Sequence, residues 1–314
     1  MGTRLKGKAA VVTGAGRGIG RAIAELLAAE GAAVVVNDLG GNVDGSGAQA
    51  NVADEVVAAI RASGGTAVAN HDSVTDFRAA ERLVGTAVKE FGAIDVLVNN
   101  AGILRDRMIF NMAEEDWDAV IAVHLKGTFN CTRHAAAHMR QQRRGRIISM
   151  SSTSGTIGNP GQANYGAAKD GIAAMTRVVS RELGKYGVTV NAVCPGASTR
   201  MTQTVGDAAR QARQKAGIQT PAAQSAFTLQ HTGPENVAPW VTYLASDAAA
   251  DVNGQVFFVM GGLIALMNEP APVRTIFHDG RWTPEEIATV FSRTFGLDLV
   301  NPAPPKEAPP PGGQ

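Results

Sequence analysis

Three side chains near the middle of the chain have the types and spacing needed to move a proton on an alcohol oxygen: Ser152, Tyr165 and Lys169. Tyr165 and Lys169 stand four residues apart, and apolar residues at helical spacing follow them, so both should lie on one helix face. A free phenol has a pKa of about 10, and a neighbouring ammonium lowers that pKa by stabilising the phenolate. We therefore expect Lys169 to lower the pKa of Tyr165, Tyr165 to act as a general base, and Ser152 to bind the substrate oxygen. Taken alone, the same spacing also fits a surface tyrosine and lysine on an amphipathic helix, so the surrounding elements must decide.

A glycine-rich turn near the N-terminus is suited to binding a pyrophosphate. Residues 8–13 predict a buried strand, residues 18–31 predict a helix, and the sequence between them reads Thr-Gly-Ala-Gly-Arg-Gly-Ile-Gly. Glycines let the backbone turn sharply and approach a pyrophosphate at the N-terminus of the helix. The spacing is T-G-x-x-x-G-x-G rather than G-x-G-x-x-G, but the flanking strand and helix strengthen the nucleotide interpretation. The predicted cofactor contacts of this turn are Gly14, Arg17, Gly18, Ile19 and Gly20.

The end of the next predicted strand, residues 33–38, favours NAD as the dinucleotide. Asp38 lies about 20 residues beyond the glycines, where dinucleotide folds place the carboxylate that binds the adenosine ribose. That carboxylate would repel a 2′-phosphate, whereas the basic side chain of Arg17 favours one. We give Asp38 more weight because it stands at the ribose itself. The polar, glycine-rich residues 40–50 that follow are interpreted as a flexible insertion.

Later strand ends supply the remaining predicted cofactor contacts. The strand at 67–70 leads to an adenine pocket in which Asp72 accepts from the adenine amino group. The strand at 94–98 leads to small residues that let the cofactor approach, and the strand at 188–195 leads to a loop that covers the nicotinamide. Besides Asp72, the predicted contacts at these strand ends are Ser73, Val74, Asn100, Ala101, Gly102, Pro195, Gly196 and Ser198.

Strands and helices alternate along the chain, which predicts one doubly wound, Rossmann-like α/β sheet of about seven parallel strands with helices on both faces. We expect this domain to span residues 1–265, with a substrate lid at 203–232. Residues 266–300 are expected to form an extension with one helix near Thr283, where the sequence carries a capping signal. The proline-rich residues 301–314 are expected to be a disordered tail.

Composition limits the possible classes of function. Of the 314 residues, 45% are apolar and 18% are charged, as in an ordinary globular protein with a sizeable core. The net charge of +1 gives no general attraction to nucleic acid or to an anionic membrane. Cys131 and Cys194 each lie in an apolar run, so buried free thiols are expected rather than a disulfide or a metal site. No segment approaches the roughly 18 apolar residues of a membrane span, and the N-terminus lacks a signal peptide, so we predict a cytoplasmic protein.

Four ordered motifs carry a family resemblance: the glycine turn at 13–20, Asn-Asn-Ala-Gly at 99–102, Ser152 with the pair Tyr165 and Lys169, and Pro-Gly at 195–196. Together they resemble the short-chain dehydrogenase/reductase family, over about residues 5–265. A narrower likeness, in Val-Asn-Asp-Leu-Gly-Gly at 36–41 and Ile-Leu-Arg-Asp-Arg at 103–107, is to the dehydrogenase domain of the peroxisomal multifunctional enzyme type 2. That domain is a (3R)-hydroxyacyl-CoA dehydrogenase, also named 17β-hydroxysteroid dehydrogenase type 4.

The resemblance implies an NAD-dependent oxidoreductase that interconverts a secondary alcohol and a ketone. The first expectation is (3R)-3-hydroxyacyl-CoA in fatty-acid or sterol side-chain β-oxidation; steroid or other alcohols are the alternative, and a non-catalytic dinucleotide-binding module is a minor one. In this mechanism Lys169 also binds the nicotinamide ribose. The family further implies a homodimer or homotetramer, paired through the helices around Trp117 and Ile172. Most members have Asn at the position of His124, so His124 is left outside the catalytic set.

An acyl-CoA substrate carries several phosphate charges, which a chain of net charge +1 must bind locally. Each basic residue expected near the pocket is either a phosphate contact or a solubilising charge. The candidates are Arg105, Arg107, Arg200, Arg210, Arg213 and Lys215.

Overall fold

The computed structural model describes residues 2–47, 49, 51–197, 232–299, 301 and 302. All but the last residue of the predicted lid therefore lie outside the described residues, as do Ser198, the basic residues from Arg200 to Lys215 and nearly all of the predicted tail. The chain divides into two compact units, Met1–Met267 and Asn268–Gln314. The sheet and the candidate site belong to the first unit.

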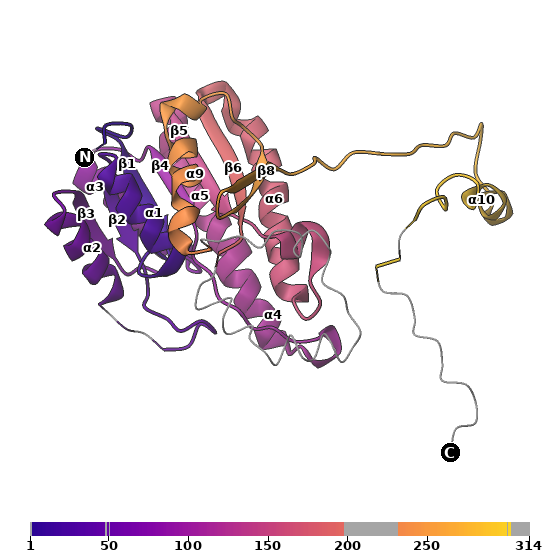
Figure 1. Ribbon diagram of the computed structural model, residues 1–314, viewed down its shortest axis with the longest axis horizontal. Coiled ribbons are helices and arrows are strands. Elements are labelled where there is room, and N and C mark those ends of the chain that lie inside the picture. Colours follow the sequence, from indigo (N-terminus) through magenta and orange to yellow (C-terminus); the bar gives the residue numbers. More distant parts are fainter. Residues whose placement is uncertain (1, 48, 50, 198–231, 300, 303–314) are drawn as a thin grey trace, which may run out of the picture. The chain divides into compact units, whose positions relative to one another are not determined.

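One eight-stranded sheet forms the centre of the first unit, in the order β3-β2-β1-β4-β5-β6-β7-β8 (Figure 1). The strands are β1 Ala9–Thr13, β2 Ala33–Asn37, β3 Thr66–Asn70, β4 Val96–Asn99, β5 Gly145–Met150, β6 Val188–Pro195, β7 Val256–Met260 and β8 Leu263–Leu266. The α-helices are α1 Gly18–Ala29, α2 Val52–Ala62, α3 Phe77–Phe91, α4 Glu114–Ile121, α5 Gly127–Gln142, α6 Ala163–Leu183, α9 Ala238–Ala245 and α10 Pro284–Phe291. The predicted doubly wound α/β sheet is confirmed.

Apolar side chains cover both faces of the sheet, which explains why the inner strands read as continuous apolar runs. On one face, a buried cluster joins alternate strand residues to α1, α2 and α9, with Leu27 and Leu244 among its largest members. On the other face, a second cluster joins the sheet to α3, α5 and α6, with Leu83 and Met139 at its centre. Helices pack on both faces of the sheet and fix the inner strands, so the carboxyl ends of these strands keep defined positions relative to one another.

The strand order reverses between β1 and β4, which are neighbours in space although they are far apart in sequence. In open α/β sheets, ligands bind in the crevice that opens at such a switch point, beyond the carboxyl ends of the strands. The glycine turn after β1 and the Asn-Ala-Gly turn after β4 meet there. The topology therefore places two of the sequence motifs side by side.

The last strand, β8, was missed by the sequence analysis, which counted seven strands and assigned residues from 266 onward to the extension. β8 pairs antiparallel with β7, and Met260 stands opposite Leu263, so only Gly261 and Gly262 form the turn. Two glycines between short apolar runs are a hairpin signal. Residues 254–262 by themselves predict one final parallel strand, and this pattern does not show that the chain turns back at Gly261 and Gly262.

In the second unit, α10 begins where the capping signal predicts. Thr283 accepts from the Glu286 backbone N–H at 3.2 Å, and the Glu286 carboxylate accepts from the Thr283 backbone N–H at 2.8 Å. This is a complete capping box. In the described part of the chain, no helix has the length and apolar character needed to cross a bilayer.

Candidate active site

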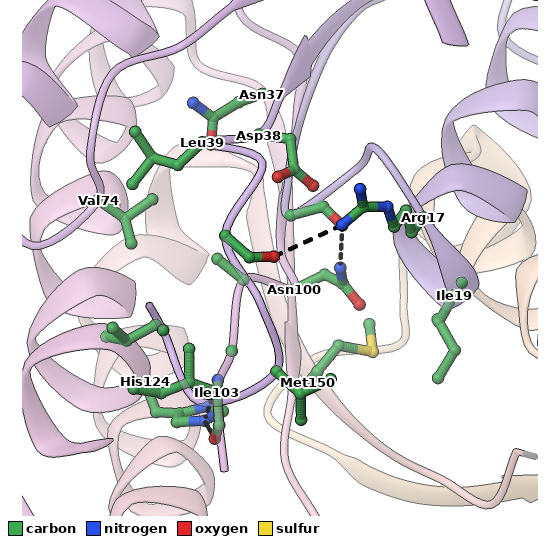
Figure 2. A pocket seen from close by; sticks show the side chains of 18 of the residues that line it. Arg17, Ile19, Asn37, Asp38, Leu39, Val74, Asn100, Ile103, His124 and Met150 are labelled. Atoms are coloured by element: carbon green, nitrogen blue, oxygen red, sulfur yellow. Dashed lines mark hydrogen bonds between the residues drawn. The ribbon is translucent and has the colours of Figure 1, made fainter. Parts of the chain in front are cut away.

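A cavity of about 350 Å³ lies at the switch point, beyond the ends of β1, β2, β3, β4 and β6 (Figure 2). Cavities of this size are typical of small-molecule and cofactor sites. Figure 2 shows Arg17 and Asp38 toward one end of the view and His124 with Ile103 toward the other. The predicted residues that line the cavity are Gly14, Arg17, Gly18, Ile19, Asp38, Asp72, Ser73, Val74, Asn100, Ala101, Gly102, Tyr165, Lys169 and Pro195.

The glycine turn is held against the β4 turn by a small hydrogen-bond network. The Thr13 hydroxyl accepts from the backbone N–H groups of Asn100 and Ala101 at 2.9 and 3.0 Å. The Asn100 side-chain amide donates in return to the carbonyl oxygens of Thr13 and Gly14, at 3.0 and 2.9 Å. Gly14 has a φ of +61°, and a Cβ there would lie 2.7 Å from the Ala101 Cα. The Asn100 side chain thus holds the turn after β1 and the turn after β4 together.

Two of the predicted cofactor-contact glycines, Gly20 in the turn and Gly196 after β6, are not among the residues that line the cavity. A Cβ on Gly20 would clash with the Gly14 carbonyl oxygen and the Asn100 side chain. A Cβ on Gly196 would lie 2.8 Å from the Met260 side chain. Both positions need glycine because neighbouring protein atoms lie close. Their contact with a cofactor stays a prediction.

The Asp38 carboxylate is fixed at the edge of the cavity by backbone donors. Its Oδ2 accepts from the Gly16 N–H at 2.8 Å, and its Oδ1 accepts from the Gly40 N–H at 2.7 Å. Each carboxylate oxygen has further lone pairs for ligand hydroxyls. The Arg17 guanidinium does not pair with Asp38; it donates to Gln49 and to the Gly41 carbonyl oxygen.

Near the end of β3, the Asp72 carboxylate already has two protein partners. Its Oδ1 accepts from the Arg82 guanidinium, at 2.6 Å from Nη2, and its Oδ2 accepts from the Asn70 amide at 3.0 Å. These bonds fix the carboxylate at the cavity wall and leave lone pairs for another donor.

The glycine-rich segment after β2 is part of the site, so its interpretation as a mere insertion is wrong. Residues 41–43, Gly45 and Gly47 line the cavity. The Val43 carbonyl oxygen accepts from the Leu104 N–H at 2.8 Å, and the Asp44 carbonyl oxygen accepts from Arg105 Nε at 2.9 Å. Only the folded chain brings this segment to the β4 turn, and sequence reading therefore missed it.

Of the three residues with alcohol chemistry, Tyr165 and Lys169 line the cavity, and Ser152 lies beside Tyr165. Lys169 is only 4% exposed, and its Nζ donates to the Met150 carbonyl oxygen at 2.5 Å. The same Nζ lies 5.5 Å from the centre of the Tyr165 ring. Ser152, which follows β5, is hydrogen-bonded to Tyr165. The helix face expected from the four-residue spacing is therefore present; Lys169 is buried on it and Tyr165 is half-buried.

Burial shifts the pKa values of this pair in opposite directions. It raises the pKa of Tyr165 to about 12; the Ser152 hydrogen bond opposes the rise, while Asp106 and Cys194 add to it. Burial lowers the pKa of Lys169 to about 7, and Cys194 opposes that change. The expected lowering of the Tyr165 pKa is therefore wrong for this structure. Burial is the largest cause of both shifts, because it disfavours the charged form of each group.

His124 lies against Tyr165, although sequence reasoning left it outside the site. Its ring meets the tyrosine ring edge-on with centroids 5.1 Å apart, and its Nε2 lies 2.8 Å from the Ile103 carbonyl oxygen. Burial lowers the pKa of His124 to about 3, with the Lys169 charge adding to the effect. Gly102 makes room for it, because a Cβ there would clash with the imidazole. A π-helical turn, Ala122–Lys126, carries His124 between α4 and α5, and such turns are frequent at functional sites.

Both cysteines are free and buried, as the sequence predicts. Cys194 nevertheless lies close enough to influence Tyr165 and Lys169. Burial raises its own pKa to about 11, so it is a neutral thiol at neutral pH. Its place on β6 next to β5 could be inferred from the parallel strand order.

The basic residues proposed for phosphate binding are only partly within the described chain. Arg105 is already engaged: it donates to Asp44, donates to the Glu115 carbonyl oxygen at 3.2 Å and lies 3.9 Å from the Asp116 carboxylate. Arg107 is exposed. Arg107 therefore remains a candidate phosphate contact, whereas Arg105 has a structural role.

The chain is similar in sequence and in structure to known dehydrogenases. The family model described as "short chain dehydrogenase" matches residues 8–210. The hydroxyacyl-CoA dehydrogenase ChsB1 of Mycobacterium tuberculosis is 45% identical over 302 residues, which cover 93% of this chain and 90% of that protein. The peroxisomal multifunctional enzyme type 2 of Mus musculus is 45% identical over 261 residues, which cover 83% of this chain and 32% of that longer protein. A crystal structure of a short chain dehydrogenase from Mycobacterium avium matches with a TM-score of 0.79 and 46% identity, covering 93% of this chain and 96% of that one.

Proposed function

Because the chain belongs to the short-chain dehydrogenase family and is therefore an oxidoreductase acting on CH–OH groups, we propose that it oxidises (3R)-3-hydroxyacyl-CoA to 3-oxoacyl-CoA with NAD. The observation that carries the proposal is that Tyr165 and Lys169 line the same cavity as the glycine turn, with Ser152 hydrogen-bonded to Tyr165. A dehydrogenase needs a proton acceptor and a dinucleotide site in this relation.

The residues of the cavity fit a nicotinamide dinucleotide. Gly14 lets the turn approach a pyrophosphate at the N-terminus of α1, and the fixed Asp38 carboxylate offers oxygen atoms to ribose hydroxyls. Such a cofactor, when bound, supplies the hydride acceptor. We assign NAD rather than NADP because the Asp38 charge opposes a 2′-phosphate and Arg17 is turned toward Gln49 and Gly41.

The proton step is assigned to the chain's own groups. Ser152 and Tyr165 hold the substrate hydroxyl, and Tyr165 accepts its proton while the carbon-bound hydride leaves. Lys169, held by the Met150 carbonyl oxygen, provides positive charge beside the tyrosine in its protonated form and binds the nicotinamide ribose. His124 is neutral at neutral pH and packs against the tyrosine ring.

The substrate class is supported by two relatives that are 45% identical over most of this chain, a hydroxyacyl-CoA dehydrogenase and a peroxisomal multifunctional enzyme type 2. We also propose a cytoplasmic homodimer or homotetramer that pairs through α4, α5 and α6. The apolar side chains that these helices expose are Trp117, Phe129 and Val178, whereas Ile172 is buried in the chain's own core.

The test is a substrate panel with the purified chain: (R)- and (S)-3-hydroxyacyl-CoAs and steroid alcohols, each with NAD and with NADP. We expect the highest kcat/KM for an (R)-3-hydroxyacyl-CoA with NAD. A steroid alcohol oxidised far more efficiently than every acyl-CoA would replace the substrate proposal with a hydroxysteroid dehydrogenase. A preference for NADP would contradict the role given to Asp38. Dinucleotide binding without turnover on any of the alcohols would favour a non-catalytic binding module.

A further inference from the structure

Gln162 is a nearly buried side chain that precedes the tyrosine helix and that the proton step does not use. It is 6% exposed and stands at the N-cap of α6, but its side chain makes no capping hydrogen bond. Instead, its Oε1 accepts from the Ser154 hydroxyl at 2.8 Å and from the Asn159 amide at 2.7 Å. Its Nε2 donates to Asp106 Oδ2 at 2.8 Å. A side chain that served only to start the helix would bond to the helix backbone.

These bonds join three separate segments around the site. Asp106 belongs to the loop after β4, whose backbone also pairs with the Gln162 segment through the Arg107 N–H and the Gly161 carbonyl oxygen at 2.9 Å. Ser154 belongs to the turn that follows β5 and carries Ser152. Gln162 is three residues before Tyr165. One amide therefore connects the cofactor-side loop, the serine turn and the tyrosine helix.

The charge of Asp106 decides which atoms donate and which accept in the hydrogen bonds around Gln162. An ionised carboxylate only accepts, so the Gln162 NH₂ must face Asp106 and the Gln162 carbonyl oxygen must face the serine turn. That oxygen then requires donors from Ser154 and Asn159. The Ser154 backbone N–H in turn donates to Ser152 Oγ at 3.1 Å, so the Ser152 oxygen accepts from the turn while its hydroxyl bonds to Tyr165.

We propose that Gln162, oriented by Asp106, is a positioning residue that holds the Ser152 turn at the correct distance and orientation to Tyr165. The inference rests on the proposed function, because it assigns Gln162 a purpose only if Ser152 and Tyr165 act on an alcohol. Misplacement of reacting groups by about 1 Å can lower turnover by about 10²-fold. Removal of this amide should therefore affect turnover rather than cofactor binding.

The test uses the polarity of the Asp106 and Gln162 pair. Gln162→Leu removes all three bonds at similar volume; we expect kcat to fall by about 10 to 10²-fold, with NAD affinity unchanged. Gln162→Glu keeps the acceptor for Ser154 and Asn159 but sets two carboxyl groups at the distance where they share one proton. Its kcat relative to wild type should therefore fall as pH rises from about 6 to about 9.

Adding Asp106→Asn to Gln162→Glu reverses the pair, because the new amide donates to the new carboxylate. Compared with Asp106→Asn alone, the double variant should show no additional fall of kcat with rising pH. Using Asp106→Asn as the reference removes the effect of the Asp106 charge on the pKa of Tyr165. Other charged groups on the surrounding elements are Arg105 and Arg107 on the same loop, Asp116 on α4 and Lys169 on α6. They are unchanged in all four proteins, so the comparison isolates the pair.

Gln142→Leu is the matched control. That amide bonds twice to the Ile94 backbone, at 3.3 and 2.9 Å, just before β4 and at the opposite edge of the sheet. It should lower the melting temperature and leave kcat unchanged. The inference is overturned if folded Gln162→Leu turns over like wild type, or if the loss in Gln162→Glu is the same at every pH and is not restored by Asp106→Asn. Wild-type turnover in Tyr165→Phe would instead overturn the proposed function.

Discussion

The buried imidazole of His124 should make the fold sensitive to mild acid. The side chain is 1% exposed, and burial, helped by the nearby charge of Lys169, lowers its pKa from the ordinary 6.5 to about 3; the Ile103 hydrogen bond only partly opposes this. Its Nδ1 has no hydrogen-bond partner among the described residues. A proton added to the ring would therefore be a charge in an apolar pocket beside another cation.

The sign and size of the effect follow from the two pKa values. Because the folded-state pKa is below the unfolded one, the unfolded chain binds a proton that the folded chain does not take up between about pH 6.5 and about pH 3. Stability is complete above the upper value and is lost as pH falls below it. At about pH 5, this one group should cost about 2 kcal/mol of the free energy of unfolding.

The assay is urea unfolding of wild type and His124→Asn at about pH 7.5 and about pH 5. The variant loses the titrating group, so its free energy of unfolding should fall by about 2 kcal/mol less than that of wild type over the same interval. His71→Asn is the control, because His71 is exposed and pairs with Asp54 at the surface. Equal acid sensitivity of wild type and His124→Asn would refute the reasoning.

Three predictions concern catalysis and the cofactor. Tyr165→Phe keeps the ring packed against His124 but removes the proton acceptor, so turnover should fall by about 10² to 10⁴-fold with little change in NAD affinity; steady-state kinetics and a binding titration check both. Asp38→Asn should weaken NAD binding and reduce the discrimination against NADP, as measured by the ratio of the two kcat/KM values, and an unchanged ratio would contradict the ribose assignment. Because the pKa of Tyr165 is raised to about 12 and that of Lys169 is lowered to about 7, kcat/KM for alcohol oxidation should rise up to about pH 7 and level off above it, where loss of the Lys169 charge offsets the gain in deprotonated tyrosine. Ketone reduction, which needs the protonated tyrosine, should not rise with it; an oxidation rate that falls as pH approaches about 7 from below would contradict the base role.

Much of the site could be predicted because its motifs are local. The turn at Gly14 lies between a strand and a helix that are both readable from apolar patterning, and the four-residue spacing of Tyr165 and Lys169 survives in any helix. Asn100 lies on the cavity wall, as expected, because parallel strands bring their carboxyl ends to one edge; its contact with a cofactor stays a prediction. Each of these inferences needs only one or two consecutive elements.

The parts that sequence reasoning missed depend on contacts between distant segments. Nothing in residues 41–47 indicates that Val43 will bond to Leu104, because the two meet only after β1, β2 and β4 have been ordered in the sheet. Gln162 likewise looks like an ordinary loop residue until Asp106 and Ser154 are brought to its two ends. Side-chain hydrogen bonds between separate loops leave no periodic signal.

The pKa of Tyr165 shows most directly why a correct pairing did not give a correct energy. The sequence places an ammonium one helical turn from a phenol, and in water that arrangement favours the phenolate. In the folded chain Lys169 is buried and Tyr165 is half-buried, and this loss of contact with water penalises the charged form of each. The penalty moves the phenol up to about 12 and the amine down to about 7, so both approach neutrality. The spacing determines that the two groups meet, but the depth at which the fold places them determines which of them is charged.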